Sequence, residues 1–488
     1  MTKKNLKKLI ICLIIVTVLA ASGLIIGITA ANKYTRYEID MTLDSDKMVL
    51  TAAQSVDYYN ASGIGLDVIK FNLYPNAFRE GAKIKPYYDF DISYPDGIDY
   101  GWINIAGVKT GGKALSYSVG GADMNVLTVE LEKTLKNRRR QSIDIEYSVK
   151  IPKTHMRLGY YGQTVNLTNF FPSVCVYENG AFIECPYLPT GDPFYSEAAD
   201  FKVTLSTDRA YTAAHSGDKV SEEASGESRS FKFSGKRIRD FALCLSESFG
   251  VKSIKSGKIT VNYYYQKGDL NVAEKSALTL DVLTFFGEYF SRYPYKTYSV
   301  AETFLTAGGM EYPNLVFVNK DLKESDKDTV IVHETAHQWW YGIVGSDNLK
   351  SAWMDEGLAE FSTELYFAKN SRLLKALEYY QGNYAASKRF DDIIKEINPA
   401  NITMDKGLNE FSSEYEYVAA VYSRGHLLFK DVYKTIGEGS FKQALRSYIN
   451  KNQYGIAHKE NMTDAFNEYY SGDIRIIFGE WISFTKNY

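Results

Sequence analysis

The sequence predicts a multidomain protein, in which a strand-rich N-terminal part and a more helical C-terminal part follow an apolar N-terminal segment. Three observations support this fold class. The length of 488 residues exceeds what one hydrophobic core usually serves. Apolar and polar residues alternate up to about residue 250, whereas apolar residues recur at helical spacing from about residue 270. A run without any charge lies ahead of both parts.

The uncharged run spans residues 9–31 and follows four lysines within residues 1–8. Its 23 residues are enough for a helix to cross a bilayer core of about 30 Å. The basic flank predicts that residues 1–8 stay in the cytoplasm. We therefore expect a transmembrane signal anchor at 9–31, with the protein single-pass in the cell membrane and its catalytic portion extracellular. The alternative is a signal peptide cleaved near Ala31, which would leave a secreted protein, although signal peptides usually have a shorter apolar region.

Strand patterns dominate the part from residue 33 to about residue 250. In Val126–Leu131 and again in Ser142–Val149, apolar residues occupy every second position, which is typical of strands with one buried face. The basic run Lys136–Arg140 between them predicts a solvated turn. The polar segment Ser221–Ser230 is rich in small residues and predicts a loop.

Helical spacing begins at Ala273–Tyr289 and continues toward the C-terminus. The change of pattern predicts a domain boundary near residues 250–260. We therefore expect an N-terminal β domain over residues 33–255 and a catalytic domain over residues 256–488.

One helical turn, His333-Glu334-Thr335-Ala336-His337, predicts the chemistry of the C-terminal part, together with Glu356 nineteen residues later. Residues i and i+4 of a helix lie on one face, so both imidazoles can reach a single metal ion. Two imidazoles and a carboxylate are ligands of a catalytic Zn²⁺ that keeps one position open for water. We expect one Zn²⁺ per chain, held by His333, His337 and Glu356. Glu334 would then accept a proton instead of binding the metal.

The overall charge of the chain bears on its partners. The net charge of -3 gives no sign of a nucleic-acid partner.

Cys175 and Cys185 flank Asn179-Gly180, a hairpin signal that would bring the two cysteines near each other. A disulfide and two free buried thiols are both compatible with this pattern. Four histidines match no ligand spacing and are expected in core or surface positions: His155, His215, His426 and His458.

Three segments together resemble the gluzincin aminopeptidase family, which includes aminopeptidase N and leukotriene A4 hydrolase. Gly308-Gly309-Met310-Glu311-Tyr312 is similar to the family's exopeptidase motif, with Tyr312 where the family usually has Asn. The two histidines and Glu356 have the spacing of the family's zinc signature. Val421-Tyr422-Ser423-Arg424-Gly425 resembles the segment that holds its catalytic tyrosine.

The resemblance implies a β-sandwich-like N-terminal domain followed by a thermolysin-like catalytic domain. It also implies that Tyr422 stabilises the oxyanion and that Glu311 pairs with the free α-ammonium of a peptide. Gly308, Gly309 and Met310 would lie beside that ammonium. Glu360 shares a helix face with Glu356, so it either orients a ligating histidine or is a solvated or salt-bridged glutamate.

The predicted function is that of a zinc-dependent aminopeptidase, which removes N-terminal residues from peptides with a free N-terminus and uses Glu334 as general base. Two alternatives remain open. A zinc endopeptidase is favoured if Glu311 cannot reach a substrate amine. A non-catalytic, membrane-anchored peptide-binding protein is the other alternative, and the complete set of metal-site residues argues against it.

Overall fold

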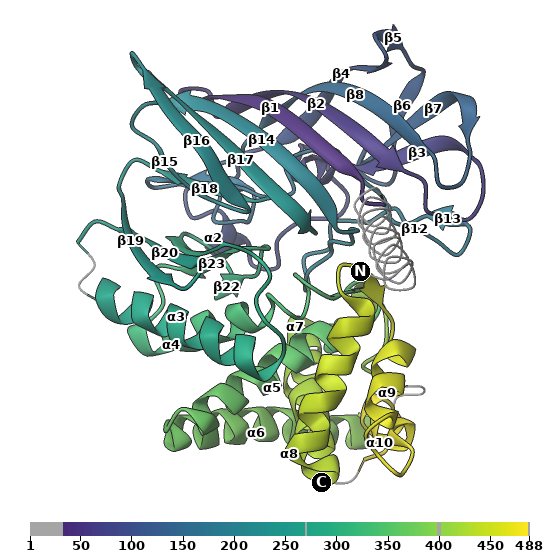
Figure 1. Ribbon diagram of the computed structural model, residues 1–488, viewed down its shortest axis with the longest axis vertical. Coiled ribbons are helices and arrows are strands. Elements are labelled where there is room, and N and C mark those ends of the chain that lie inside the picture. The colour runs from purple at the N-terminus through teal and green to yellow at the C-terminus, as the bar shows by residue number, and fades with distance from the viewer. Residues whose placement is uncertain (1–32, 269–270, 398–401, 487–488) are drawn as a thin grey trace, which may run out of the picture.

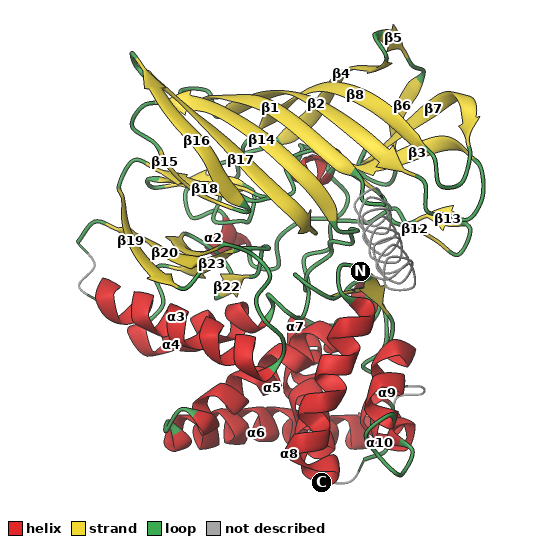
Figure 2. Cartoon of the chain, in the orientation of Figure 1, coloured by secondary structure: helices red, strands yellow, loops and turns green. Residues whose placement is uncertain are grey.

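A computed structural model describes residues 33–268, 271–397 and 402–486 (Figure 1). The chain forms a strand-rich N-terminal part, followed by a part in which a small sheet is joined to a group of helices. Figure 2 shows that the strands gather at one end of the molecule and the long helices at the other. The predicted order of a strand-rich part before a helical part is confirmed.

The largest sheet of the N-terminal part has eight strands in the order β16-β17-β14-β1-β2-β8-β4-β5. Strand β1 runs parallel to β14, and the other neighbours are antiparallel. In β1, buried and exposed residues alternate, so Tyr37, Ile39, Met41 and Leu43 face the core. The strands are β1 (Arg36–Asp44), β2 (Val49–Tyr59), β4 (Trp102–Thr110), β5 (Lys113–Ala114), β8 (Arg140–Lys150), β14 (Ala199–Asp208), β16 (Asp218–Ser225) and β17 (Ser228–Ile238).

Two four-stranded sheets and a short hairpin complete this part and share its hydrophobic core with the large sheet. One sheet has the order β11-β3-β7-β6 and the other β15-β18-β10-β9. Their strands are β3 (Leu66–Asn72), β6 (Tyr117–Gly120), β7 (Val126–Leu135), β9 (Gly159–Tyr161), β10 (Thr164–Leu167), β11 (Ser173–Val174), β15 (Thr212–His215) and β18 (Leu243–Ser246). The hairpin pairs β12 (Tyr177–Glu178) with β13 (Ala181–Phe182), and two short helices are η1 (Tyr74–Phe78) and α2 (Phe90–Ser93).

Three local predictions have clear outcomes here. The basic run Lys136–Arg140 does form the turn from β7 to β8. The predicted loop at Ser221–Ser230 is wrong, because these residues belong to the hairpin of β16 and β17. Strand β16 is exposed at most positions on both faces, so it carries no apolar alternation to reveal it. Cys175 and Cys185 are buried and free, as one of the two alternatives expected.

A five-stranded sheet opens the C-terminal part, in the order β19-β20-β21-β23-β22. Helix α3 (Val272–Tyr289) makes the crossover between the parallel strands β20 and β21, as such connections require. The strands are β19 (Phe249–Ser256), β20 (Ile259–Gln266), β21 (Thr297–Thr303), β22 (Gly309–Met310) and β23 (Leu315–Asn319). Strand β22 lies at the edge of this sheet and runs antiparallel to β23.

The helices form one apolar core with this sheet. Helix α5 is central, since every residue from Trp353 to Phe367 is buried. The helices are α4 (Glu324–Ala336), α5 (Trp353–Lys369), α6 (Leu373–Ile397), η2 (Leu408–Glu410), α7 (Glu414–Tyr417), η3 (Val418–Arg424), α8 (Gly425–Asn452), α9 (Lys459–Asn467) and α10 (Ile474–Ile482), with a two-stranded pair of β24 (Gly345–Ser346) and β25 (Ile456–Ala457).

Two glycines let α5 and α8 approach closely. A Cβ atom on Gly357 would lie 2.9 Å from the Cα atom of Gly425, closer than carbon atoms pack. This contact fixes the start of α8, and therefore the preceding segment η3, against the helix that carries Glu356.

The predicted location in the cell membrane is contradicted. Across the described ranges, no helix combines the length and the apolar character needed to cross a bilayer. Segment α8, which is interrupted by a non-helical residue at Gly437, carries Lys430, Asp431 and Lys434 within its first ten residues. The predicted span at residues 9–31 lies outside the described residues.

Candidate active site

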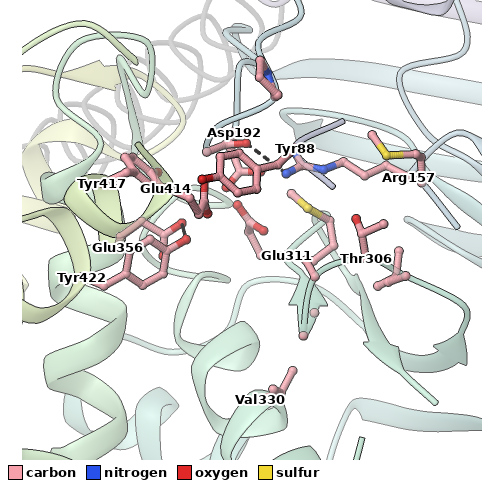
Figure 3. Close-up of a pocket in the computed structure, with 18 of the residues that line it drawn as sticks. Tyr88, Arg157, Asp192, Thr306, Glu311, Val330, Glu356, Glu414, Tyr417 and Tyr422 are labelled. Atoms are coloured by element: carbon pink, nitrogen blue, oxygen red, sulfur yellow. Dashed lines mark hydrogen bonds and ion pairs between the residues drawn. The ribbon is translucent and has the colours of Figure 1, made fainter. Parts of the chain in front are cut away.

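The predicted site residues line one cavity of about 570 Å³, which also receives side chains from the strand-rich part (Figure 3). From the strand-rich part come Tyr88, Arg157 and Asp192. The C-terminal part contributes Gly308, Gly309, Met310, Glu311, His333, Glu334, His337, Glu356, Glu360 and Tyr422. The cavity is therefore a cleft between the two parts of the chain.

His333, His337 and Glu356 converge at the base of this cleft. His333 lies in the last turn of α4 and His337 caps that helix, so their Nε2 atoms are 3.0 Å apart. A carboxylate oxygen of Glu356, from the first turn of α5, lies 3.3 Å from each of these nitrogens. Zinc with four tetrahedral ligands at about 2.05 Å requires ligand separations of about 3.3 Å. The three donor atoms thus fit a zinc ion in both type and spacing.

The charges around this cluster favour a cation. Burial alone would lower the pKa of His333, but hydrogen bonds with Glu356 and Glu360 raise it to about 10. Burial would raise the pKa of Glu356, yet the charges of His337 and His333 hold it well below its ordinary value. Positive charge is therefore stabilised where the imidazoles meet Glu356.

Each histidine is also held from its other ring nitrogen. Nδ1 of His337 lies 2.6 Å from Oδ1 of Asp355, and Asn348 donates to the second oxygen of that carboxylate at 3.0 Å. Nδ1 of His333 lies 3.3 Å from Oε1 of Glu360. Such partners fix the ring orientation and the tautomer of a metal ligand. Asp355 was missed in the sequence, although its position directly before Glu356 is a signal that could have found it.

Glu334 faces the cleft beside the edge strand β22. Burial raises the pKa of its carboxyl to about 7, against the lowering effect of the two histidines. Its Oε2 atom is buried and has no hydrogen-bond partner among the described residues. A Cβ on Gly309 would come within 2.5 Å of Oε1 of Glu334, so only glycine lets the strand lie so close. A carboxyl with this position and this pKa can exchange a proton near neutral pH.

Glu311 follows the same edge strand and is 4 % exposed. Burial, and then the charge of Asp192, raise the pKa of Glu311 well above its ordinary value. One of its carboxylate oxygens lies within 4.8 Å of one ring nitrogen of His337 and of one carboxylate oxygen of Asp355. The ring of Tyr312 points elsewhere, into a small core cluster, where it packs edge-on against Phe317 with a centroid separation of 5.2 Å. The departure from the family's motif at Tyr312 therefore lies outside the cleft wall.

Tyr422 reaches the cluster from η3, a π-helical segment between α7 and α8. Its hydroxyl donates a hydrogen bond of 2.7 Å to Oε1 of Glu356. The two side chains lie next to each other in Figure 3. Its ring stacks on that of His333, with centroids 6.1 Å apart. Burial and the charge of Glu356 raise the pKa of the phenol well above 10, so Tyr422 keeps its proton. Single π-helical turns often occur at functional sites.

The four other histidines lie away from this cluster, as expected. His215 and His426 are buried, His155 packs against Tyr161, and His458 is a surface residue that contacts Glu178. The structure instead adds an ion pair that sequence reasoning missed. Arg157 pairs with Asp192 inside the cleft, and both come from the strand-rich part, far from the metal motif in sequence.

Two histidines at the end of one helix and a glutamate in the first turn of the next, with a buried carboxylate beside them in a cleft, define the class of zinc-dependent hydrolases. Residues 275–481 match the peptidase family M1 domain, which confirms the resemblance to the gluzincin aminopeptidases. An M1 zinc metallopeptidase of Deinococcus radiodurans has a similar fold, with a TM-score of 0.66 over 93% of this chain and 95% of that chain at 14% identity.

The curated relatives match this chain over only part of their own length. Aminopeptidase 2, mitochondrial, of Saccharomyces cerevisiae is 27% identical over 46% of this chain, but the match covers 25% of that protein. Tricorn protease-interacting factor F2 of Thermoplasma acidophilum is 22% identical over 82% of this chain and 52% of its own length. The chain thus matches only a quarter to a half of these relatives. The yeast relative's name places it in mitochondria, in contrast to the cell-surface location predicted from residues 1–31.

Proposed function

We propose that this protein is a zinc-dependent aminopeptidase that removes N-terminal residues from peptides. The observation that carries the proposal is the convergence of His333, His337 and Glu356 at separations of 3.0–3.3 Å, in a cleft that also holds Glu334 and Glu311. Peptidase family M1 similarity over residues 275–481 supports it. So do relatives named as aminopeptidases and a Deinococcus radiodurans M1 metallopeptidase mutant solved with a Tyr-Ser-Ala substrate.

His333, His337 and Glu356 would hold one zinc ion, with Asp355 and Glu360 orienting the two imidazoles. When bound, zinc lowers the pKa of water toward about 7 and polarises a peptide carbonyl. The protein's own contribution is to fix these three side chains on two packed helices, α4 and α5, so that their donor atoms converge at the cleft.

Three further side chains would act on the substrate. Glu334 accepts the proton of the attacking water and passes it to the leaving amine, which suits a carboxyl whose pKa is about 7. Tyr422, which keeps its proton, donates a hydrogen bond to the oxyanion that forms at the carbonyl. Glu311 pairs with the α-ammonium of the substrate, so a charged N-terminus becomes a condition of binding.

The edge strand β22 would align the peptide. Gly308, Gly309 and Met310 line the cleft beside Glu334, and β22 is the last strand of its sheet. An extended peptide can pair with such a free edge through its main chain. The α-ammonium would then reach Glu311, the residue that follows Met310.

We also infer that the domain arrangement follows the family's pattern. The N-terminal β domain, residues 33–255, would be β-sandwich-like, since its sheets share one core. Residues 256–488 would form the thermolysin-like domain, with strands β20 to β23 of the five-stranded sheet and with α4 and α5 around the metal site. Strand β19 of the same sheet lies just before this range.

A panel of aminoacyl fluorogenic amides, with and without a chelator, tests the proposal. The expected result is hydrolysis of free aminoacyl amides that a chelator abolishes and added Zn²⁺ restores. Cleavage only within longer peptides would favour the endopeptidase instead. Peptide binding without hydrolysis would favour the non-catalytic alternative.

A further inference from the structure

The segment that carries Tyr422 also carries a buried arginine, Arg424, which has no part in the reaction proposed above. Residues 414–452 run from α7 through η3 into α8, and Val418–Arg424 is the π-helical section of this stretch. Side chains two residues apart on a helix point to nearly opposite sides. Tyr422 lines the cleft and lies beside Glu356 in Figure 3, so Arg424 faces the packed interior behind it.

Arg424 is held in that interior by two other helices. Its side chain is completely buried, and its Nη1 lies 2.8 and 2.9 Å from the two carboxylate oxygens of Asp391 on α6. Its Nε donates to the carbonyl oxygen of Trp481 on α10 at 2.7 Å. The guanidinium also lies over the rings of Trp481 and Phe484, at 5.0 and 4.0 Å from their centroids. These contacts need a planar group with several fixed donors, which lysine does not offer.

The π-helical form of η3 requires support from outside the segment. Such turns are rare, and an unusual local conformation persists only where its surroundings determine it. Gly425, the next residue, packs on Gly357 of α5, and His426 pairs with Glu364 of the same helix at 2.7 Å. These contacts fix the start of α8 against α5, while Arg424 ties the last residue of η3 to α6 and α10.

The position of the Tyr422 phenol depends on how η3 is oriented. Its hydroxyl lies 2.7 Å from Oε1 of Glu356, and its ring stacks on that of His333. Hydrogen bonds weaken steeply with poor alignment, so a donor that stabilises an oxyanion must be held in place before the charge develops. A small rotation of η3 would move the hydroxyl out of line. Contacts that hold the opposite side of η3 therefore bear directly on the phenol.

We propose that Arg424, through its ion pair with Asp391, is a positioning residue that holds Tyr422 where it stabilises the oxyanion. This inference rests on the proposed aminopeptidase function and adds a residue to its mechanism. Arg424 does not line the cleft, so it acts on the reaction through the backbone of η3. Its effect should appear in kcat and not in zinc binding or KM, because Tyr422 acts on the transition state.

A double-mutant cycle on kcat tests whether Arg424 acts through Tyr422. Arg424→Lys keeps the charge but loses the planar group, so it should lower kcat for a fluorogenic aminoacyl amide by about 10- to 100-fold. Zinc content and KM should stay close to those of wild type. In a protein that already carries Tyr422→Phe, Arg424→Lys should lower kcat by less than about twofold, because the hydroxyl that Arg424 positions is gone.

Two further variants serve as a second test and a control. Asp391→Asn removes the charge that Arg424 pairs with and should give the same pattern in both backgrounds, so it decides the question if Arg424→Lys does not fold. Arg446→Lys makes the matched change on α8 outside the cleft, where Arg446 donates to the carbonyl oxygen of Tyr289 at 3.1 Å. It should leave kcat at the wild-type value.

The outcomes separate the inference from the proposed function. Equal kcat losses with and without the Tyr422 hydroxyl would show that Arg424 supports folding in general, which overturns the inference but not the proposed function. An unchanged kcat in Arg424→Lys, or a loss of zinc from the folded variant, also overturns the inference alone. A near-wild-type kcat in Tyr422→Phe overturns the inference together with the role of Tyr422. No hydrolysis of any amide by the wild-type protein overturns both the inference and the proposed function.

Discussion

Removing the negative charge of Asp355 should weaken zinc binding more than removing that of Glu360. Asp355 and His337 are both almost completely buried, and the 2.6 Å between Oδ1 and Nδ1 is the length of a charge-assisted hydrogen bond. The corresponding contact of Glu360 with His333 is longer, at 3.3 Å. Loss of such a partner typically costs about 10- to 100-fold in metal affinity, or about 1.4–2.8 kcal/mol. We expect Asp355→Asn to reach this range and Glu360→Gln to fall below it.

Competition between the protein and a chromophoric chelator measures this affinity without any turnover. Both replacements keep the size of the side chain, so Asn348 retains a neighbour to bond and packing changes little. Thermal unfolding of the zinc-free proteins serves as the control for folding. Equal zinc affinities in Asp355→Asn and wild type, with both proteins folded, would refute the reasoning.

Three further predictions separate binding, chemistry and folding. Glu334→Gln should retain zinc by metal analysis but lose turnover, because an amide cannot act as a base. Tyr422→Phe should also retain zinc but lose turnover by about 10²–10³-fold, because Phe donates no hydrogen bond. A near-wild-type kcat in either variant would reject the role proposed for that residue. Glu311→Ala should lose about 2–5 kcal/mol of transition-state stabilisation on free aminoacyl amides, measured as kcat/KM, with zinc retained. Burial lowers the pKa of His215 to about 4, against about 6.5 in the unfolded chain, so the unfolded state binds more protons between these values. Stability should therefore fall by about 3 kcal/mol as pH drops from about 6.5 to about 4, and urea unfolding of His215→Phe should show a smaller fall.

The metal cluster could be predicted because its three residues lie close together in the sequence. His333 and His337 are one helical turn apart, and Glu356 follows at a fixed distance in the next helix, so spacing alone brings three ligands together. Their assignment as ligands stays a prediction until zinc is measured. Glu311 and Tyr422 were found only through resemblance, since neither spacing nor composition singles out one tyrosine among 39.

Long-range contacts explain what the sequence did not reveal. Arg157 and Asp192 line the cleft although they lie more than 100 residues before the metal motif in sequence. No local sequence pattern predicts that these residues contact the cleft. The π-helical turn of η3 and the contact of Gly357 with Gly425 likewise depend on how α5 and α8 pack. Strand β16 was mistaken for a loop because it lies at the edge of its sheet with most side chains in solvent.

Digestion of one short peptide in free and N-acetylated forms, followed by mass spectrometry, tests the central claim most directly. The zinc-loaded protein should shorten the free peptide one residue at a time from its N-terminus and leave the acetylated peptide intact, because Glu311 requires an α-ammonium. A chelator should stop the reaction and Zn²⁺ should restore it. Cleavage of both peptides at similar rates, or activity that no chelator affects, would contradict the account.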